Sequence, residues 1–137
     1  MQNENRSAAE VFAAMSEGTL DPAGFTHRDH VICAAFALRG YDFFEAAFLY
    51  ANGLKVLVKK AGVPEKFNAT VTFAFLSIIA QKLAESPGVS ADVLPEHCPE
   101  LMQKTLLSPW YTGAVLASNH ARQFPVMPQM KSARGVG

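Results

Sequence analysis

Every residue from 31 to 38 is apolar, and this run follows directly on a helix start signal. In that signal, the Thr26 side chain can accept a hydrogen bond from the amide of Asp29, and the Asp29 carboxylate can accept one from the amide of Thr26. A helix that is apolar all round has no face suited to water, so it is buried on several sides. The run therefore predicts a central helix that ends at Gly40 and is surrounded by other elements of one core.

Three further long helices are predicted around this central one. The first begins at a second capping box, formed by Ser7 and Glu10, and ends at Gly18. A helix over about 42–61 and another from between 64 and 68 to about 85 follow from their apolar periodicity. Prolines limit helix length in the rest of the chain, where short helices are expected near 91–94, 99–105, 109–112 and 118–123.

The overall pattern predicts an all-α fold, because no segment alternates between polar and apolar residues as a strand would. We expect a compact helical bundle of four main helices plus short C-terminal helices. The length of 137 residues fits a single domain, 1–137, with an ordered core over about 7–128. The tail, 130–137, is expected to be mobile.

Two features of the sequence favour a homodimer. Charged residues make up 18% of the chain, against roughly 25% in typical soluble domains. The helix over 42–61 carries two apolar stripes, which implies two packing neighbours. Both observations predict apolar surface that a partner covers, and a second copy of the chain is the simplest partner. One stripe holds Phe44, Ala47, Phe48, Ala51, Leu54 and Val58, and the other holds Phe43, Ala46, Tyr50 and Leu57.

Charge and targeting signals argue against several classes of protein. The 12 basic residues balance the 12 acidic ones, so no basic surface is expected for DNA or RNA. The polar start of the chain has no signal-peptide core, and no run is long and apolar enough to span a membrane. Cys33 and Cys98 do not form a disulfide framework. A cytoplasmic protein with no membrane or nucleic-acid partner is expected.

The histidines at the start of the central helix are the best candidates for chemistry. His27 and His30 are three residues apart, so both imidazoles lie on one helix face, with Cβ atoms about 5–6 Å apart. The positive end of the helix dipole favours neutral imidazole, which can bind a metal ion or act as a general base. They are the predicted catalytic residues; the alternative is that one caps the helix and the other packs locally. Asp29 lies off this face and is better explained as a cap.

Four other residues are predicted ligand contacts. Asn68 can cap the helix that follows it, and Thr72 shares its face. If that helix starts at the same end of the bundle as the central helix, both residues face the paired histidines. Arg28, which lies between the histidines in sequence, and Tyr111 are the other two candidates, although core or dimer packing is the commoner role of such an aromatic.

A metal site at the histidine pair would need a further ligand. Zinc and iron sites take three or more donors from histidine, cysteine or carboxylate. The remaining candidates are His97, Cys98 and His120, and nothing in their spacing fixes them to the pair. A divalent metal bound by His27 and His30 therefore has less support than a small-molecule pocket.

Several motifs of the chain are similar to those of a known family. They are Phe25-Thr26-His27-Arg28-Asp29-His30, Glu65-Lys66-Phe67-Asn68-Ala69-Thr70-Val71-Thr72 with Ala74-Phe75-Leu76, and Leu106-Leu107-Ser108 with Tyr111, Ser118 and Arg122. Over about 24–128, the chain resembles a family of small, uncharacterised bacterial all-helical proteins with the motif F-T-H-x-D-H. The resemblance implies a histidine at the place of Asn68, as a third ligand or an acid–base residue. This sequence departs from the family there, because asparagine is a poor ligand for zinc or copper and does not exchange protons near neutral pH.

Two kinds of function fit these observations. In the first, the protein is a small-molecule enzyme that uses His27 and His30 in a pocket at a helix N-terminus, with its reaction undetermined. In the second, it is a non-catalytic ligand-binding protein or a dimeric interaction protein.

Overall fold

The computed structural model describes residues 6–128, and every regular element in that range is helical. Four main helices come first: α1 (Ala8–Glu17), α2 (His27–Gly40), α3 (Phe43–Lys60) and α4 (Ala69–Glu85). Three short helices follow, α5 (Leu94–His97), α6 (Gly113–Leu116) and α7 (Asn119–Gln123), and 3-10 turns cover Pro22–Gly24, Pro64–Lys66, Ala91–Val93 and Pro99–Met102. The predicted all-α bundle of four main helices and short C-terminal helices is confirmed.

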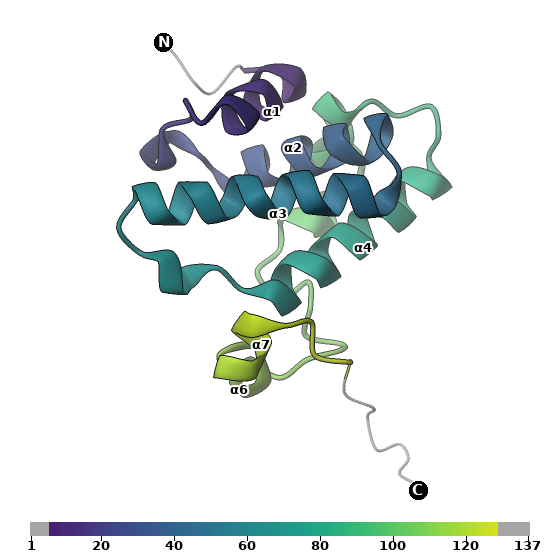
Figure 1. Ribbon diagram of the computed structural model, residues 1–137. Helices are drawn as coiled ribbons and strands as arrows, with labels where there is room; N and C mark the ends of the chain where they lie inside the picture. Colours follow the sequence, from purple (N-terminus) through teal and green to yellow (C-terminus); the bar gives the residue numbers. More distant parts are fainter. Residues whose placement is uncertain (1–5, 129–137) are drawn as a thin grey trace, which may run out of the picture.

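Helix α2 lies at the centre of the bundle. It contacts α1, α3, α4 and α5, and Figure 1 shows it beneath α1 and behind α3. Residues 31–35 and Ala37 are wholly buried. Because these residues lie on all sides of the helix and not along one stripe, α2 is covered all round. Several of them are alanines, which lets the neighbouring helices approach closely. The predicted central helix is therefore confirmed.

The first turns of α1 and α2 are fixed by the two predicted capping boxes. Ser7 and Glu10 exchange hydrogen bonds at the start of α1, and Thr26 and Asp29 do so at the start of α2. Gly18 ends α1 with a φ of 74°, in the left-handed region that favours glycine. Capping satisfies amide groups that have no partner within the helix, so these residues set where each helix begins.

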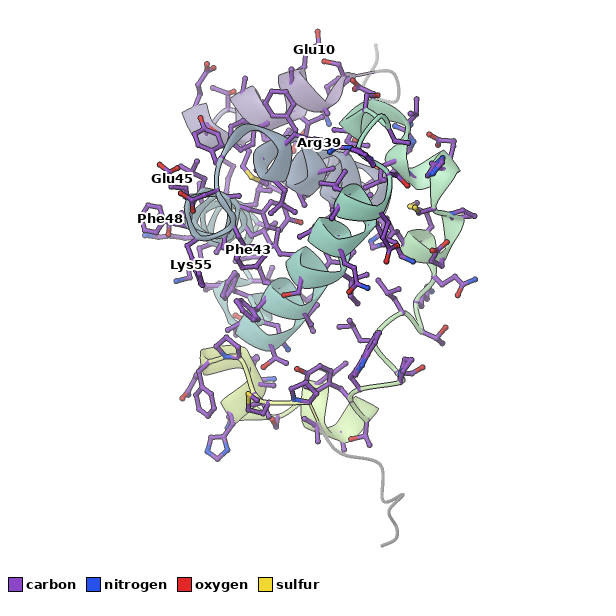
Figure 2. The ribbon with its side chains drawn as sticks, turned by 90° about the vertical axis from the view of Figure 1, so that its right-hand side faces the viewer. Glu10, Arg39, Phe43, Glu45, Phe48 and Lys55 are labelled. Carbon is purple, nitrogen blue, oxygen red and sulfur yellow. The ribbon has the colours of Figure 1, made fainter. Side chains whose placement is uncertain are left out.

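Helix α3 lies at the surface of the bundle; one of its two predicted stripes packs against the core, and the other does so only in part. Ala46, Tyr50 and Leu57 are buried. On the other stripe, Phe44 and Phe48 are 75% and 66% exposed, and Figure 2 shows Phe48 on the outer side of the helix. Ala47 and Leu54 of that stripe pack against the core, so the part of the stripe that residues 6–128 leave uncovered lies at Phe44 and Phe48.

The C-terminal segment packs against the first turns of α4. Figure 1 shows α6 and α7 next to that end of α4. The buried hydroxyl of Thr70 donates a hydrogen bond to the carbonyl of Phe124, with an oxygen–oxygen distance of 2.8 Å, and accepts one from the amide of Val126 at 2.9 Å. One buried side chain of α4 therefore holds two positions of the segment that follows α7.

The helix predicted near 109–112 is wrong. Residues 109 and 110 lie in a turn, and 111 and 112 have no regular structure. Helix α6 starts later, at Gly113, because the Thr112 side chain caps it by accepting a hydrogen bond from the amide of Val115. The mobile tail predicted over 130–137 lies outside the described residues. Within residues 6–128, no helix has the combination of length and apolar character that crossing a membrane requires.

Candidate functional site

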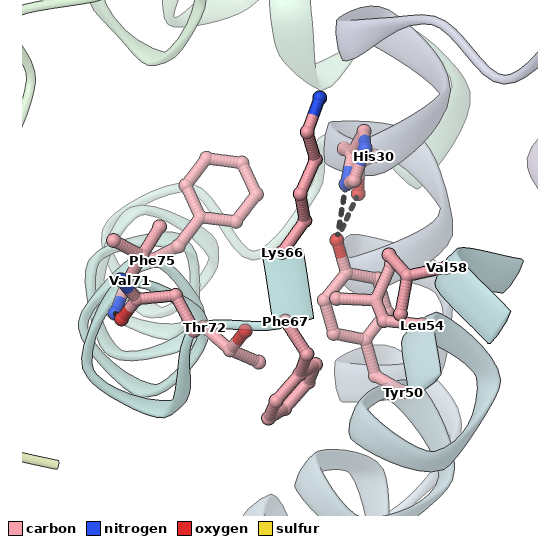
Figure 3. Close-up of a pocket in the computed structure, with 10 residues that line it drawn as sticks. His30, Tyr50, Leu54, Val58, Lys66, Phe67, Val71, Thr72 and Phe75 are labelled. Atoms are coloured by element: carbon pink, nitrogen blue, oxygen red, sulfur yellow. Dashed lines mark hydrogen bonds between the residues drawn. The ribbon is translucent and has the colours of Figure 1, made fainter. Parts of the chain in front are cut away.

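A pocket of about 170 Å³ lies between the start of α2, the middle of α3 and the start of α4 (Figure 3). Helices α3 and α4 supply most of its apolar wall, and the segment between them supplies the rest. The apolar lining residues are Leu54, Val58, Phe67, Val71 and Phe75, and the polar ones are His30, Tyr50, Lys66, Asn68 and Thr72.

His30 contributes an uncharged imidazole to this pocket. Burial first, and then the nearby charge of His27, lower the pKa of His30 to about 4, against an opposing effect of Asp29. The ring also packs against Phe25, with ring centroids 4.3 Å apart. At neutral pH, His30 therefore carries one ring proton and one free lone pair.

Tyr50 determines which of the two imidazole nitrogens faces the pocket unpaired. Its phenol oxygen lies 3.0 Å from Nδ1 of His30, and 3.5 Å from the carbonyl oxygen of the same residue. Burial raises the pKa of Tyr50 well above its ordinary value of 10, so the phenol keeps its proton. Within residues 6–128, no hydrogen bond engages Nε2 of His30.

The Tyr50 hydroxyl permits two arrangements of the proton on His30. When the hydroxyl donates to Nδ1, Nε2 carries the proton and can donate to a ligand. When the hydroxyl instead donates along the longer path to the His30 carbonyl, Nδ1–H donates to the phenol oxygen and Nε2 can accept. Both arrangements use the 3.0 Å contact, but the second also needs the hydroxyl to donate over 3.5 Å, which is long for an O–H···O bond. The first arrangement, in which Nε2–H is the donor, is therefore favoured.

Asn68 and Thr72 lie in the same pocket wall but differ in what they offer a ligand. The Asn68 side chain accepts a hydrogen bond from Val71 at the start of α4, and its Nδ2 donates to the carbonyl of Leu116 at 2.7 Å. Both ends of this amide are therefore occupied. Thr72 is only 8% exposed, and its hydroxyl has no hydrogen-bond partner in the part of the chain that the structure describes.

His27 lies outside the residues that line the pocket. Its side chain is exposed, and Nε2 lies 3.0 Å from the carbonyl oxygen of Leu101. The rings of His27 and His30 are on one side of α2, with centroids 6.2 Å apart, but only His30 forms part of the wall. The structure therefore does not bring the two predicted catalytic residues into one cavity.

Arg28 and Tyr111, the other two predicted ligand contacts, also lie away from this pocket. Arg28 pairs with both carboxylate oxygens of Glu96, at 3.0 Å and 2.9 Å, and this contact raises the pKa of the guanidinium and lowers that of Glu96. Tyr111 donates to the carbonyl of Val126 at 2.8 Å and lines a separate groove beside α4. Both contacts tie distant segments of the chain together.

The donor set for a metal ion is incomplete in the described range. No group of three or more histidine, cysteine, aspartate or glutamate side chains is placed to hold an ion there. One nitrogen of His27 is occupied by Leu101, and Nε2 of His97 lies 3.1 Å from the hydroxyl of Ser86. The predicted metal site therefore has no ligands in this range besides the imidazoles of His27 and His30.

Tyr50 and Lys66 are site residues that the sequence did not point to. Tyr50 was assigned to an apolar stripe of α3, and it does pack there, with its hydroxyl reaching His30. Lys66 ends a 3-10 turn just before the cap of α4. A polar atom within an otherwise apolar stripe was the one signal that could have identified Tyr50.

The family resemblance rests on sequence motifs, of which the structure gathers His30, Lys66, Phe67, Asn68 and Thr72 at one pocket. Membership of that family stays a prediction. Comparison of the chain with family models, with curated proteins and with solved structures finds no match in any of the three.

Proposed function

We propose that this protein binds a small molecule in the pocket of His30, with Nε2 of His30 and the hydroxyl of Thr72 as its polar contacts. The observation that carries the proposal is that both groups line the pocket with no hydrogen-bond partner among residues 6–128. Neither atom is sealed from solvent, since the buried polar side-chain atom without a partner in that range is Nε of Arg6. A ligand that reaches these groups would replace their contacts with water by directed hydrogen bonds.

Binding is favoured over catalysis by the state of the imidazole. A general acid or base works best when its pKa lies near the working pH. Because the pKa of His30 is lowered to about 4, the imidazole is a weak base at neutral pH and serves better as a fixed hydrogen-bonding group. The position of His27 outside the pocket also favours binding, since the second predicted imidazole is missing from the wall.

A titration with neutral single-ring molecules, such as benzene and phenol, tests the proposal. Amide resonances of α4 around Thr72 should shift in the wild-type protein as the pocket fills. His30→Gln and Thr72→Val should weaken the binding of phenol, which needs a hydrogen-bond partner, whereas His27→Gln, outside the pocket, should not. Equal binding of phenol to all four proteins, or shifts that avoid the pocket, would argue against this function.

A homodimer is the second part of the proposal. Phe44 and Phe48 project from α3 without cover from residues 6–128, and large aromatic side chains of this kind are common at interfaces. Light scattering at micromolar concentration should give twice the chain mass of 14.8 kDa. Phe44→Glu with Phe48→Glu should give the monomer mass, while Val93→Glu, an exposed apolar site elsewhere, should keep the dimer. A wild-type mass of 14.8 kDa would rule the dimer out.

The proposed location is the cytoplasm. Cys33 and Cys98 are both free thiols, as expected in a reducing compartment. Cell fractionation with an antibody to the protein would test this assignment.

A further inference from the structure

We propose that the ligand of the His30 pocket is a small monocarboxylic acid whose apolar part is about the size of one ring. This inference rests on the proposed function and adds the chemical class of the ligand. It places the apolar part among the side chains of α3 and α4, and the carboxylate at the mouth, beside Lys66.

The size of the pocket limits the apolar part of the ligand. An apolar cavity of roughly 150 Å³ is large enough to hold benzene, and this pocket measures about 170 Å³. Leu54 and Val58 face it from α3, and Val71 and Phe75 face it from α4. A single aromatic ring or a short branched chain would fill such a space.

The two unpaired polar groups suit an acceptor on the ligand. Nε2 of His30 carries the proton in the favoured arrangement of the Tyr50 hydroxyl, and the hydroxyl of Thr72 can also donate. Figure 3 shows Thr72 projecting from α4 toward the side of the pocket where Tyr50 lies. A carboxylate has two acceptor oxygens and no donor, so it can accept from Nε2–H of His30, whereas Thr72 lies on the other side of the pocket from the Lys66 ammonium (Figure 3).

The charge around the pocket selects an anion. Lys66 is the one charged residue among those that line it, and no acidic side chain does so. No ion pair involves Lys66 within residues 6–128. An adjoining depression shares Val58 and Phe67 with the pocket, and its charged lining residues are Lys55, Lys59, Arg122 and Glu65. Three cations against one carboxylate extend the positive potential around the mouth.

The exposure of Lys66 sets the orientation of the ligand. Burying an ionised carboxylate is costly unless it is paired. Lys66 is exposed, and in Figure 3 its side chain crosses between Phe75 and His30 with the ammonium at one edge of the group. The carboxylate therefore stays near water beside Lys66, while the ring goes inward. This arrangement avoids burying the negative charge.

Benzoate, benzyl alcohol and benzene are the probes that test the charge of the ligand. All three carry one ring, and benzoate alone is ionised at neutral pH. In an NMR titration that follows the amides of α4, benzoate should bind more tightly than benzyl alcohol, by on the order of tenfold, through its contact with Lys66. Benzoate should also raise the pH at which the His30 imidazole titrates, because a nearby anion favours the charged ring.

Lys66→Met and Lys59→Met form a matched pair of variants. Both remove one exposed charge and keep most of the side-chain stem, but only Lys66 lines the pocket. Lys66→Met should remove most of the preference for benzoate over benzyl alcohol, and Lys59→Met should keep most of it. Similar losses in the two variants would contradict a specific contact with Lys66.

The neutral probes separate the two proposals. If benzene or benzyl alcohol fills the pocket and benzoate binds no better, the pocket is a binding site and the carboxylate assignment is wrong. If none of the three probes shifts the resonances of the pocket, the proposed function fails together with this inference. Benzoate binding that Lys66→Met leaves unchanged would likewise overturn the assigned orientation.

Discussion

The phenol oxygen of Tyr50 lies 3.0 Å from Nδ1 of His30 and joins the middle of α3 to the first turn of α2. Tyr50→Phe keeps the ring and removes this hydrogen bond, which leaves Nδ1 of a buried imidazole without a partner. We expect the free energy of unfolding in urea to fall by about 1–2 kcal/mol. Tyr41→Phe, at an exposed tyrosine, should change it by less than about 0.5 kcal/mol.

A double-mutant cycle with His30→Leu isolates this contact from the packing of the two side chains. The coupling between Tyr50→Phe and His30→Leu should be about 1 kcal/mol, since the second substitution loses a bond that the first has already removed. A cycle in which the two costs simply add would show that the two side chains act independently.

The stability of the protein should fall as the pH drops below about 6.5. A histidine in an unfolded chain has a pKa of about 6.5, and the pKa of His30 in the folded state is about 4. The unfolded chain therefore binds the proton first, and protonation favours unfolding between these two values. The expected contribution to the loss is about 2 kcal/mol at pH 5 and about 3 kcal/mol at pH 4.

Urea unfolding at a series of pH values from 7 to 4.5 measures this loss. His30→Gln should be less sensitive to pH by the stated amount. An unchanged pH dependence in His30→Gln would contradict the lowered pKa.

Thr70→Val should loosen the segment that follows α7. The substitution keeps the shape of the side chain but removes its hydrogen bonds to Phe124 and Val126. Hydrogen exchange at the Val126 amide should become faster, by an amount that corresponds to about 1–3 kcal/mol, while the amides of α2 keep their protection. Ser77→Ala, at an exposed hydroxyl of the same helix, is the control. Equal protection of Val126 in all three proteins would show that other contacts hold the segment.

Gly53→Ala should destabilise the protein, although alanine is the better helix former. A Cβ at this buried position of α3 would overlap Cγ and Sδ of Met15 on α1. The overlap should cost about 1–3 kcal/mol before the gain in helix propensity is subtracted. Gly40→Ala adds its methyl to open space and should be neutral or stabilising. In a Met15→Ala background, the cost at position 53 should shrink, and a cost that stays the same would place its cause elsewhere.

Features that depend on local sequence could be predicted. The Thr26 and Asp29 capping box and the apolar run after it located α2 and its central position, because caps and hydrophobic periodicity act within a few residues. Asn68 was identified as a cap in the same way. The prediction that His30, Asn68 and Thr72 share one pocket depended on the assumption that α2 and α4 start at the same end of the bundle.

Features that depend on how helices pack were missed. Tyr50 reaches His30 across twenty positions of the chain, and that contact depends on the rotation of α3 about its axis. The contact of Arg28 with Glu96 spans a longer separation still, and it turns a predicted ligand contact into a link between segments. The sequence predicted apolar surface on α3 but not its place at Phe44 and Phe48, because periodicity shows which residues share a face and not what covers that face.

The walls of the pocket differ in how readily their amino-acid sequence can change. Helix α2 places His30 on a backbone whose following residues, 31–35, are wholly buried, so most substitutions there would destabilise the fold. Lys66 and Phe67 instead come from the short connection between α3 and α4, which is exposed or partly buried. A lineage of such proteins could therefore change what enters the pocket by mutating this connection alone, while the imidazole at its opposite wall stays in place.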